Sequence, residues 1–175
     1  MKIRESVEND KKSIRMVHKN AFDQPEGETV SQLAIDLLED KTALPILSLV
    51  AEQDNEIIGN VIFSSVNIEG VEGVSAYILA PLGVTRLVQR SGIGTQLINK
   101  GLETLKERGA KIVLVYGDPN YYIRTGFKAN HNLKPPHKLK YPEEAWMAQE
   151  LEEGILAKTQ GMVQCASSLN SPEYW

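Results

Sequence analysis

The residues best suited to ligand binding, by type and by spacing, form a glycine-containing segment in the middle of the chain. Gln89, Gly92 and Gly94 follow the pattern Gln-x-x-Gly-x-Gly, between an uncharged stretch that predicts a buried strand and a periodic stretch that predicts a helix. Glycine lets backbone N–H groups approach a ligand closely, and the first N–H groups of a helix attract anions. With a cation at Arg90 and a hydroxyl at Thr95, the segment could hold a phosphate or pyrophosphate. A tight turn with close strand–helix packing is the alternative interpretation.

A second segment of interest follows about 25 residues later. Asp118 and Pro119 are typical of a helix start, with the aspartate as cap and the proline at the first helical position. The short helix predicted here carries Tyr121 and Tyr122 and ends at Gly126-Phe127. The tyrosines could simply be half-buried packing residues, which is the usual role of tyrosine. Taken alone, neither segment identifies a function.

Hydrophobic periodicity predicts a mixed α/β domain spanning residues 1–175. Alternation and apolar runs predict strands, and apolar spacing of three to four residues predicts helices. The predicted strands are Met1–Val7, Ile46–Gln53, Ile57–Ser65, Val74–Val84 and Ile112–Tyr116, and the predicted helices run from about Asp10 to Ala21, from about Val30 to Asp40 and over Gly92–Arg108. Local propensity also predicts a helix over Glu143–Leu156, followed by a C-terminal tail over about 152–175.

Composition excludes several broad classes. The 19 basic residues against 23 acidic ones give a net charge of −4, which argues against a nucleic-acid surface. The single cysteine, Cys165, cannot form an internal disulfide, so we expect a reducing, cytoplasmic compartment. The charged N-terminal segment is unlike a signal peptide, and no apolar stretch approaches the length of a membrane span. We therefore expect no nucleic-acid partner and no membrane association.

In order and separation, the two segments together resemble the GNAT superfamily of N-acetyltransferases. The combination is Gln89-x-x-Gly92-x-Gly94 followed by Tyr122-x-x-x-Gly126-Phe127, and the stretch from Gly117 to Phe127 looks like the YhbS-like branch. The resemblance implies a mostly antiparallel mixed sheet, splayed at a bulge and flanked by helices. It also implies a cofactor-binding core over about 74–127, which holds coenzyme A with pantetheine along the splayed strand and pyrophosphate on the glycine loop. The implied cofactor-binding residues are Leu82, Gly83, Val84, Gln89, Arg90, Ser91, Gly92, Ile93, Gly94, Thr95 and Tyr122.

The resemblance implies transfer of an acetyl group from acetyl-coenzyme A (acetyl-CoA) to a primary amine of a small molecule or peptide, with no metal. Backbone amides at Leu82–Val84 would hold the oxyanion, and Tyr122 would act as general acid toward the departing thiolate. The sequence departs from the family in two places. Arg86 stands where a proline is common, and Val74–Val84 contains no carboxylate base. Relatives place a strand near Trp146–Leu151, against the local helix prediction, and we follow the resemblance there.

The general base and the acceptor site are less defined. Asp118, Tyr77 or a water could act as base, although Asp118 also suits a helix cap and Tyr77 a packed strand position. The acceptor could approach near Asp23–Glu28 and Val66–Gly73, which carry carboxylates suited to a cationic amine. His18, His131 and His137 lack metal-ligand spacing, and Cys165 is not needed for direct attack by the amine.

Two other function classes remain open from the sequence. A non-catalytic coenzyme-binding regulatory module would explain the missing strand carboxylate. A purely structural domain that binds a partner would bind no coenzyme at all. The tail could also pack against a neighbouring copy in a homodimer.

Overall fold

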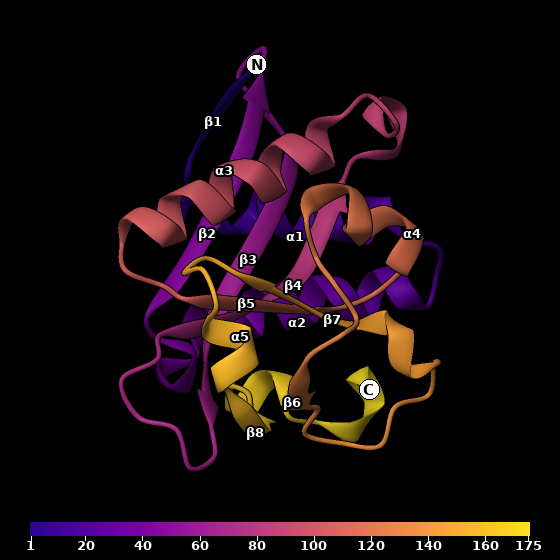
Figure 1. Ribbon diagram of the computed structural model, residues 1–175. Coiled ribbons are helices and arrows are strands. Elements are labelled where there is room, and N and C mark those ends of the chain that lie inside the picture. Colours follow the sequence, from indigo (N-terminus) through magenta and orange to yellow (C-terminus); the bar gives the residue numbers. More distant parts are fainter.

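The computed structural model describes residues 1–175 and follows the predicted order of elements as far as the short helix after Asp118 (Figure 1). The strands are β1 (Lys2–Glu5), β2 (Ile46–Gln53), β3 (Glu56–Ile68), β4 (Ala76–Val84), β5 (Ile112–Tyr116), β6 (Asn132–Lys134), β7 (Trp146–Glu150) and β8 (Gln160–Gln164). The helices are α1 (Lys11–Ala21), α2 (Glu26–Glu39), α3 (Ile93–Glu107), α4 (Pro119–Tyr122) and α5 (Ile155–Lys158). None of the helices is both long enough and apolar enough to cross a lipid bilayer.

The strands form a mixed, mostly antiparallel sheet, as predicted. Along the main path the order is β1-β2-β3-β4-β5-β7, and β4 with β5 is its one parallel pair. The crossover between these two parallel strands is α3, which is the usual kind of connection for a parallel pair. Because β4 and β5 each carry long uncharged runs, both can be covered on two faces by helices and loops.

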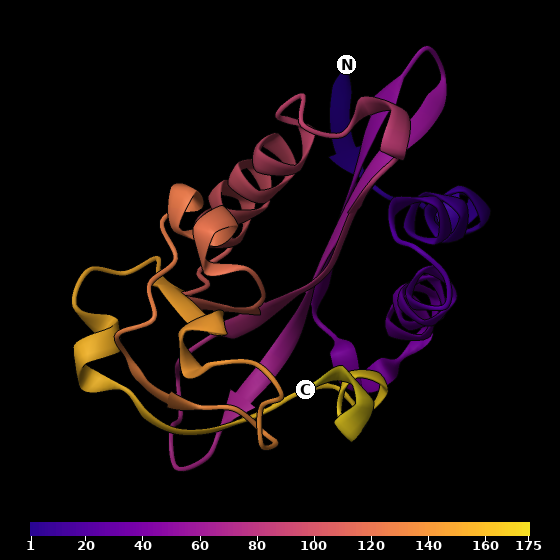
Figure 2. The same cartoon turned by 90° about the vertical axis from the view of Figure 1, so that its right-hand side faces the viewer.

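Helices cover both faces of the sheet (Figure 2). The buried side chains divide into two clusters, one beneath α1 and α2 and the other beneath α3. The α3 side is closely packed because Gly101 lies directly on the ring of Phe63, where a β-carbon would overlap the ring. Phe63 is fully buried, so this contact fixes the distance between α3 and the sheet. The position of α3 in turn fixes its N-terminal end, where the glycine segment lies.

The segment after Asn130 corrects one local prediction. The helix predicted over Glu143–Leu156 is wrong, whereas the strand implied near Trp146–Leu151 is present as β7, antiparallel to β5. Helix propensity is a weak preference, and here the exposed edge of β5 offers a full set of backbone hydrogen-bond partners. Trp146, Met147 and Ala148 are buried in this strand, so packing favours it further.

The C-terminal residues 152–175 pack on their own chain. Strand β8 pairs with the end of β3 and with β6, and the last residue, Trp175, is only 2% exposed. The indole N–H of Trp175 donates to the Leu169 carbonyl at 2.9 Å, and its ring stacks on Tyr116 with a centroid separation of 5.7 Å. The tail therefore forms part of the core beneath α2 rather than a free arm.

Candidate functional site

The sheet opens at the end of β4, on the side that faces β5. Strands β4 and β5 pair only from Ala76 to Leu79, and β4 then continues to Val84 paired with β3 but without a partner on the β5 side. A bulge against β3 lies at the same point, where the pairing moves from Phe63–Leu79 to Val61–Leu82. Because antiparallel pairs alternate in their hydrogen bonding, and Thr85 N–H donates to the Ile58 carbonyl, the peptide groups of Leu82 and Val84 point away from β3. The splay thus exposes backbone N–H and C=O groups to a ligand.

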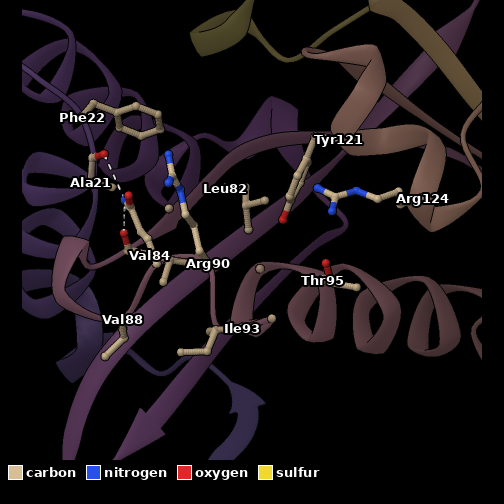
Figure 3. Close-up of a pocket in the computed structure, with 14 residues that line it drawn as sticks. Ala21, Phe22, Leu82, Val84, Val88, Arg90, Ile93, Thr95, Tyr121 and Arg124 are labelled. Carbon is tan, nitrogen blue, oxygen red and sulfur yellow. Dashed lines mark hydrogen bonds between the residues drawn. The ribbon is translucent and has the colours of Figure 1, made fainter.

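The glycine segment lies beside this open edge and begins α3. Gly92 is the N-cap of α3 with φ of +87°, and Arg90 has φ of +62°. No side chain caps this helix end, so its first N–H groups remain available, and the helix dipole favours an anion there. The side chain of Gln89 braces the loop, since its amide donates to the carbonyls of Val84 at 2.8 Å and Ala21 at 3.3 Å (Figure 3). The arrangement suits a phosphate group.

The splayed strand and the glycine segment line one cavity of about 490 Å³. Nine of the residues predicted to bind the cofactor line it: Leu82, Gly83, Val84, Gln89, Arg90, Gly92, Ile93, Gly94 and Thr95. Ser91 does not, because its hydroxyl turns back to donate to the Val88 carbonyl. Five lining residues were not predicted: Ala21, Phe22, Val88, Tyr121 and Arg124. Two arginines in the lining give the cavity the positive charge that a phosphorylated ligand requires.

The two tyrosines of α4 have different positions. Tyr121 lines the cavity, with its hydroxyl against Gly94 where a β-carbon would stand, and the Arg124 guanidinium lies 5.2 Å from its ring centre. The spacing of three residues between Tyr121 and Arg124 puts them on one helix face, a signal available in the sequence. Tyr122 does not line this cavity. Its ring packs against Gly117 and, edge to face, against Phe127 at 5.8 Å.

The chemistry of Tyr122 follows from its burial. Burial, together with the nearby Tyr121 and Asp118, raises the pKa of the Tyr122 phenol above its usual value of about 10. The phenol is therefore fully protonated at neutral pH and can donate a proton. Its ring meets Tyr121 edge to face with centroids 5.0 Å apart, so Tyr122 lies directly behind the cavity wall.

The two residues considered as the general base also differ in their accessibility. Tyr77 is 7% exposed and packs in the α3-side cluster, two residues before the splay begins. Asp118 caps α4, where its Oδ1 accepts from the Asn120 N–H at 3.0 Å, and it lines a second cavity on the other side of Tyr122. Asp118 is therefore the accessible carboxylate, whereas Tyr77 is enclosed.

The three histidines each have a hydrogen-bond partner within the fold. His18 pairs with Asn60 at 2.7 Å, His131 with the Trp146 carbonyl at 3.0 Å and His137 with the Asn170 carbonyl at 2.6 Å. No group of three or more histidine, cysteine, aspartate or glutamate side chains could hold a metal ion. Burial raises the pKa of the Cys165 thiol to about 12.

Neither segment predicted to receive the acceptor lines the cavities beside Tyr122. The carboxylate of Asp23 accepts from Arg86 at 2.6 Å, so its charge is paired. In the other segment β3 extends to Ile68, and the turn beyond it lies next to β8, where Glu69 accepts from Gln164 at 2.7 Å. Asp23, Glu28 and Glu69 therefore pair with neighbouring surface side chains, which composition alone cannot distinguish from a ligand site.

Comparison with known proteins agrees with the geometry. The model of the acetyltransferase (GNAT) family matches residues 12–127. The Escherichia coli protein YjhQ, an uncharacterized N-acetyltransferase, is 34% identical over 163 residues, which cover 90% of this chain and 88% of YjhQ. The crystal structure of YhbS from Escherichia coli in complex with coenzyme A (CoA) superposes with a TM-score of 0.87 at 31% identity, covering 98% of this chain and 92% of YhbS. A GNAT acetyltransferase from Brucella melitensis in complex with acetyl-CoA has a TM-score of 0.71 at 32% identity, with coverages of 96% and 97%. The chain belongs to the GNAT family of acetyltransferases.

Proposed function

We propose that this protein is an acetyl-CoA-dependent N-acetyltransferase that acts on a primary amine. The observation that carries the proposal is the single cavity that joins the splayed end of β4 to the glycine segment at the start of α3. The complexes of YhbS with CoA and of the Brucella melitensis protein with acetyl-CoA support the choice of coenzyme. Acetyl-CoA would supply an activated acetyl group as a thioester.

The lining of the cavity fits this coenzyme. The N–H groups after Gly92 would bind the pyrophosphate, and Arg90 would add a cation. The peptide groups of Leu82 and the N–H of Val84 would pair with the pantetheine amides, as an edge strand pairs with an added chain, whereas the Val84 carbonyl already accepts from Gln89. Because Gly94 has no side chain, the Tyr121 hydroxyl can lie against the start of α3. A β-carbon at position 94 would overlap this hydroxyl.

The chemistry requires a neutral amine, a stabilised acetyl oxygen and a protonated leaving group. A backbone N–H at Leu82 or Val84 would stabilise the negative charge that develops on the acetyl oxygen. The amine nitrogen would form the new bond to the acetyl carbon as the carbon–sulfur bond breaks, and Tyr122 would donate its proton to the departing sulfur. Asp118, directly or through a water, would accept the proton that the amine loses. Tyr77 is too enclosed for that role.

Calorimetric titration tests coenzyme binding. Gly92→Glu puts a carboxylate where the pyrophosphate would bind, and we expect saturable binding of acetyl-CoA to be lost. Gly154→Glu is a matched control. Gly154 is also a helix N-cap, with φ of +84° and open surroundings, but it lies at the start of α5 and outside the cavity. Retained binding in both variants, or absence of binding in the wild type, would contradict the proposed site.

The assigned role of Tyr122 is tested by turnover. Tyr122→Phe should lower the rate of thiol release with an amine about 100-fold or more, with little change in coenzyme affinity. Wild-type protein that binds acetyl-CoA and transfers nothing across a panel of primary amines would instead favour a non-catalytic regulatory module. The absence of a carboxylate on β4 is the observation behind that second candidate.

A further inference from the structure

A second cavity of about 470 Å³ lies at the end of β5, next to the coenzyme cavity. Its lining is formed by Tyr116, Gly117, Asp118, Pro119, Tyr141, Pro142, Ala145 and Tyr174. Three segments far apart in sequence contribute to it: the link from β5 to α4, the loop before β7 and the C-terminal end. Tyr116 and Tyr174 pack with the α1/α2-side cluster, whereas five of the seven apolar residues of the coenzyme cavity pack with the α3-side cluster. The walls of the two cavities therefore come mainly from opposite faces of the sheet.

Tyr122 contacts the linings of both cavities. On one side its ring meets Tyr121, which lines the coenzyme cavity, at 5.0 Å. On the other side it lies against Gly117, where a β-carbon would stand 2.6 Å from a ring carbon. Asp118 lines the second cavity and lies near enough for its charge to raise the pKa of Tyr122. A group bound in the second cavity would therefore be adjacent to the side chain proposed to protonate the leaving sulfur.

The lining of the second cavity has a distinct chemical character. Tyr116 and Tyr141 have ring centres 6.0 Å apart and inclined at 54°. The Tyr116 ring is held in place, because its hydroxyl accepts from the Tyr141 N–H at 3.0 Å and Trp175 stacks on its face. Asp118 is the one charged residue in the lining, and its hydrogen bond to the Asn120 N–H uses Oδ1 alone. Tyrosine faces and a carboxylate together attract an ammonium group carried on an apolar or aromatic body.

We propose that this second cavity binds the acetyl acceptor, and that the acceptor is a monoamine with an aromatic or apolar body. This inference rests on the proposed function, since it assigns the second substrate of the same reaction. Asp118 orients the amine toward Tyr122, and Tyr116, Tyr141 and Tyr174 surround the body of the substrate. A hydrophilic polyamine fits less well, because the lining offers one carboxylate for several cations.

Binding measured without turnover provides the test. 2-Phenylethylamine is titrated into protein saturated with CoA, which forms a complex that cannot react. Tyr141→Ala should weaken this binding about tenfold, since it removes one aromatic wall. Tyr141 is 69% exposed, so the variant keeps the fold. Leu44→Ala, which truncates an exposed apolar side chain (59%) outside the cavity, is the matched control and should leave binding unchanged.

A second variant tests the carboxylate. Asp118→Asn retains the capping oxygen but removes the charge, so affinity for 2-phenylethylamine should fall about tenfold or more. The uncharged analogue 2-phenylethanol should bind both proteins alike, which separates loss of charge from a collapsed cavity.

The outcomes separate this inference from the proposed function. Saturable CoA binding and acetyl transfer to 1,4-diaminobutane or kanamycin, with no binding of 2-phenylethylamine, would overturn the inference and leave the proposed function intact. Unchanged affinity in Tyr141→Ala and Asp118→Asn would also overturn it. No binding of CoA to the wild type would overturn the proposed function itself.

Discussion

Protonation of His18 should destabilise this protein at mildly acidic pH. The ring is fully buried, and its Nε2 lies 2.7 Å from Asn60 Oδ1. The Asn60 amide nitrogen already donates to Ser48 and to the Leu49 carbonyl, so Oδ1 is the acceptor and His18 Nε2 carries the proton. The other ring nitrogen, Nδ1, is buried without a partner against Gly83. A second ring proton, bound to Nδ1, would therefore be enclosed with no acceptor.

The size of the effect follows from the pKa. Burial lowers the pKa of His18 from 6.5 to about 4, against the partial compensation of its hydrogen bond to Asn60. Because the folded pKa is the lower one, the unfolded chain takes up the proton more readily, and stability falls as the pH drops from about 6.5 toward 4. A tenfold change in proton affinity corresponds to about 1.4 kcal/mol, so His18 alone should cost about 2.5 kcal/mol between pH 7.5 and pH 4.5.

Urea unfolding at the two pH values measures this contribution. His18→Gln is the comparison variant, because glutamine retains an N–H donor for Asn60 and does not titrate. Protonation of carboxylates with lowered pKa values, such as Asp10 beside Arg4, also lowers the free energy of unfolding in acid, but it does so in both proteins. The wild type should therefore lose about 2.5 kcal/mol more than the variant over this interval. Equal losses in the two proteins would refute the assignment of a buried, neutral His18.

Three further predictions concern the packing, the loop and the thiol. Gly101→Val should lower the free energy of unfolding by about 1–3 kcal/mol in urea titrations, because its β-carbon would overlap Phe63, and an unchanged midpoint would contradict this contact. Gln89→Ala removes the brace on the glycine segment, and calorimetry should show acetyl-CoA affinity about fivefold weaker, the equivalent of about one hydrogen bond; unchanged affinity would show that the loop needs no brace. Cys165 has its pKa raised to about 12 by burial, so at pH 8 an aromatic disulfide reagent should label native protein far more slowly than protein in urea. Equal labelling rates would show that the thiol is accessible.

Sequence reasoning identified most of the residues that line the cavity proposed for the coenzyme, because its signals are local. Glycines at a helix start, a preceding uncharged strand and the spacing to Tyr122 are all properties of short segments, and nine predicted residues line the observed cavity. Local reasoning failed where neighbours decided the outcome. Phe22 and Ala21 reach the cavity from the end of α1, nearly 70 residues before the glycine segment, and carry no motif. Similarly, Tyr121 and Tyr122 are adjacent in sequence, and only the direction of the single-turn α4 decides which one faces the cavity.

Short-range patterns in the chain were enough to establish the order of the elements up to α4, the glycine start of α3 and the family. These features depend on periodicity and on backbone conformations that particular residue types permit within a few positions. Three other features depend on tertiary contacts. Packing makes Trp146–Glu150 a strand, the C-terminal residues lie in the core, and Tyr116, Tyr141 and Tyr174 come together around Asp118. In each of these cases the stabilising partners lie on distant segments, such as the open edge of β5 or the stacked ring of Trp175. Local propensity contains no information about partners that folding brings together.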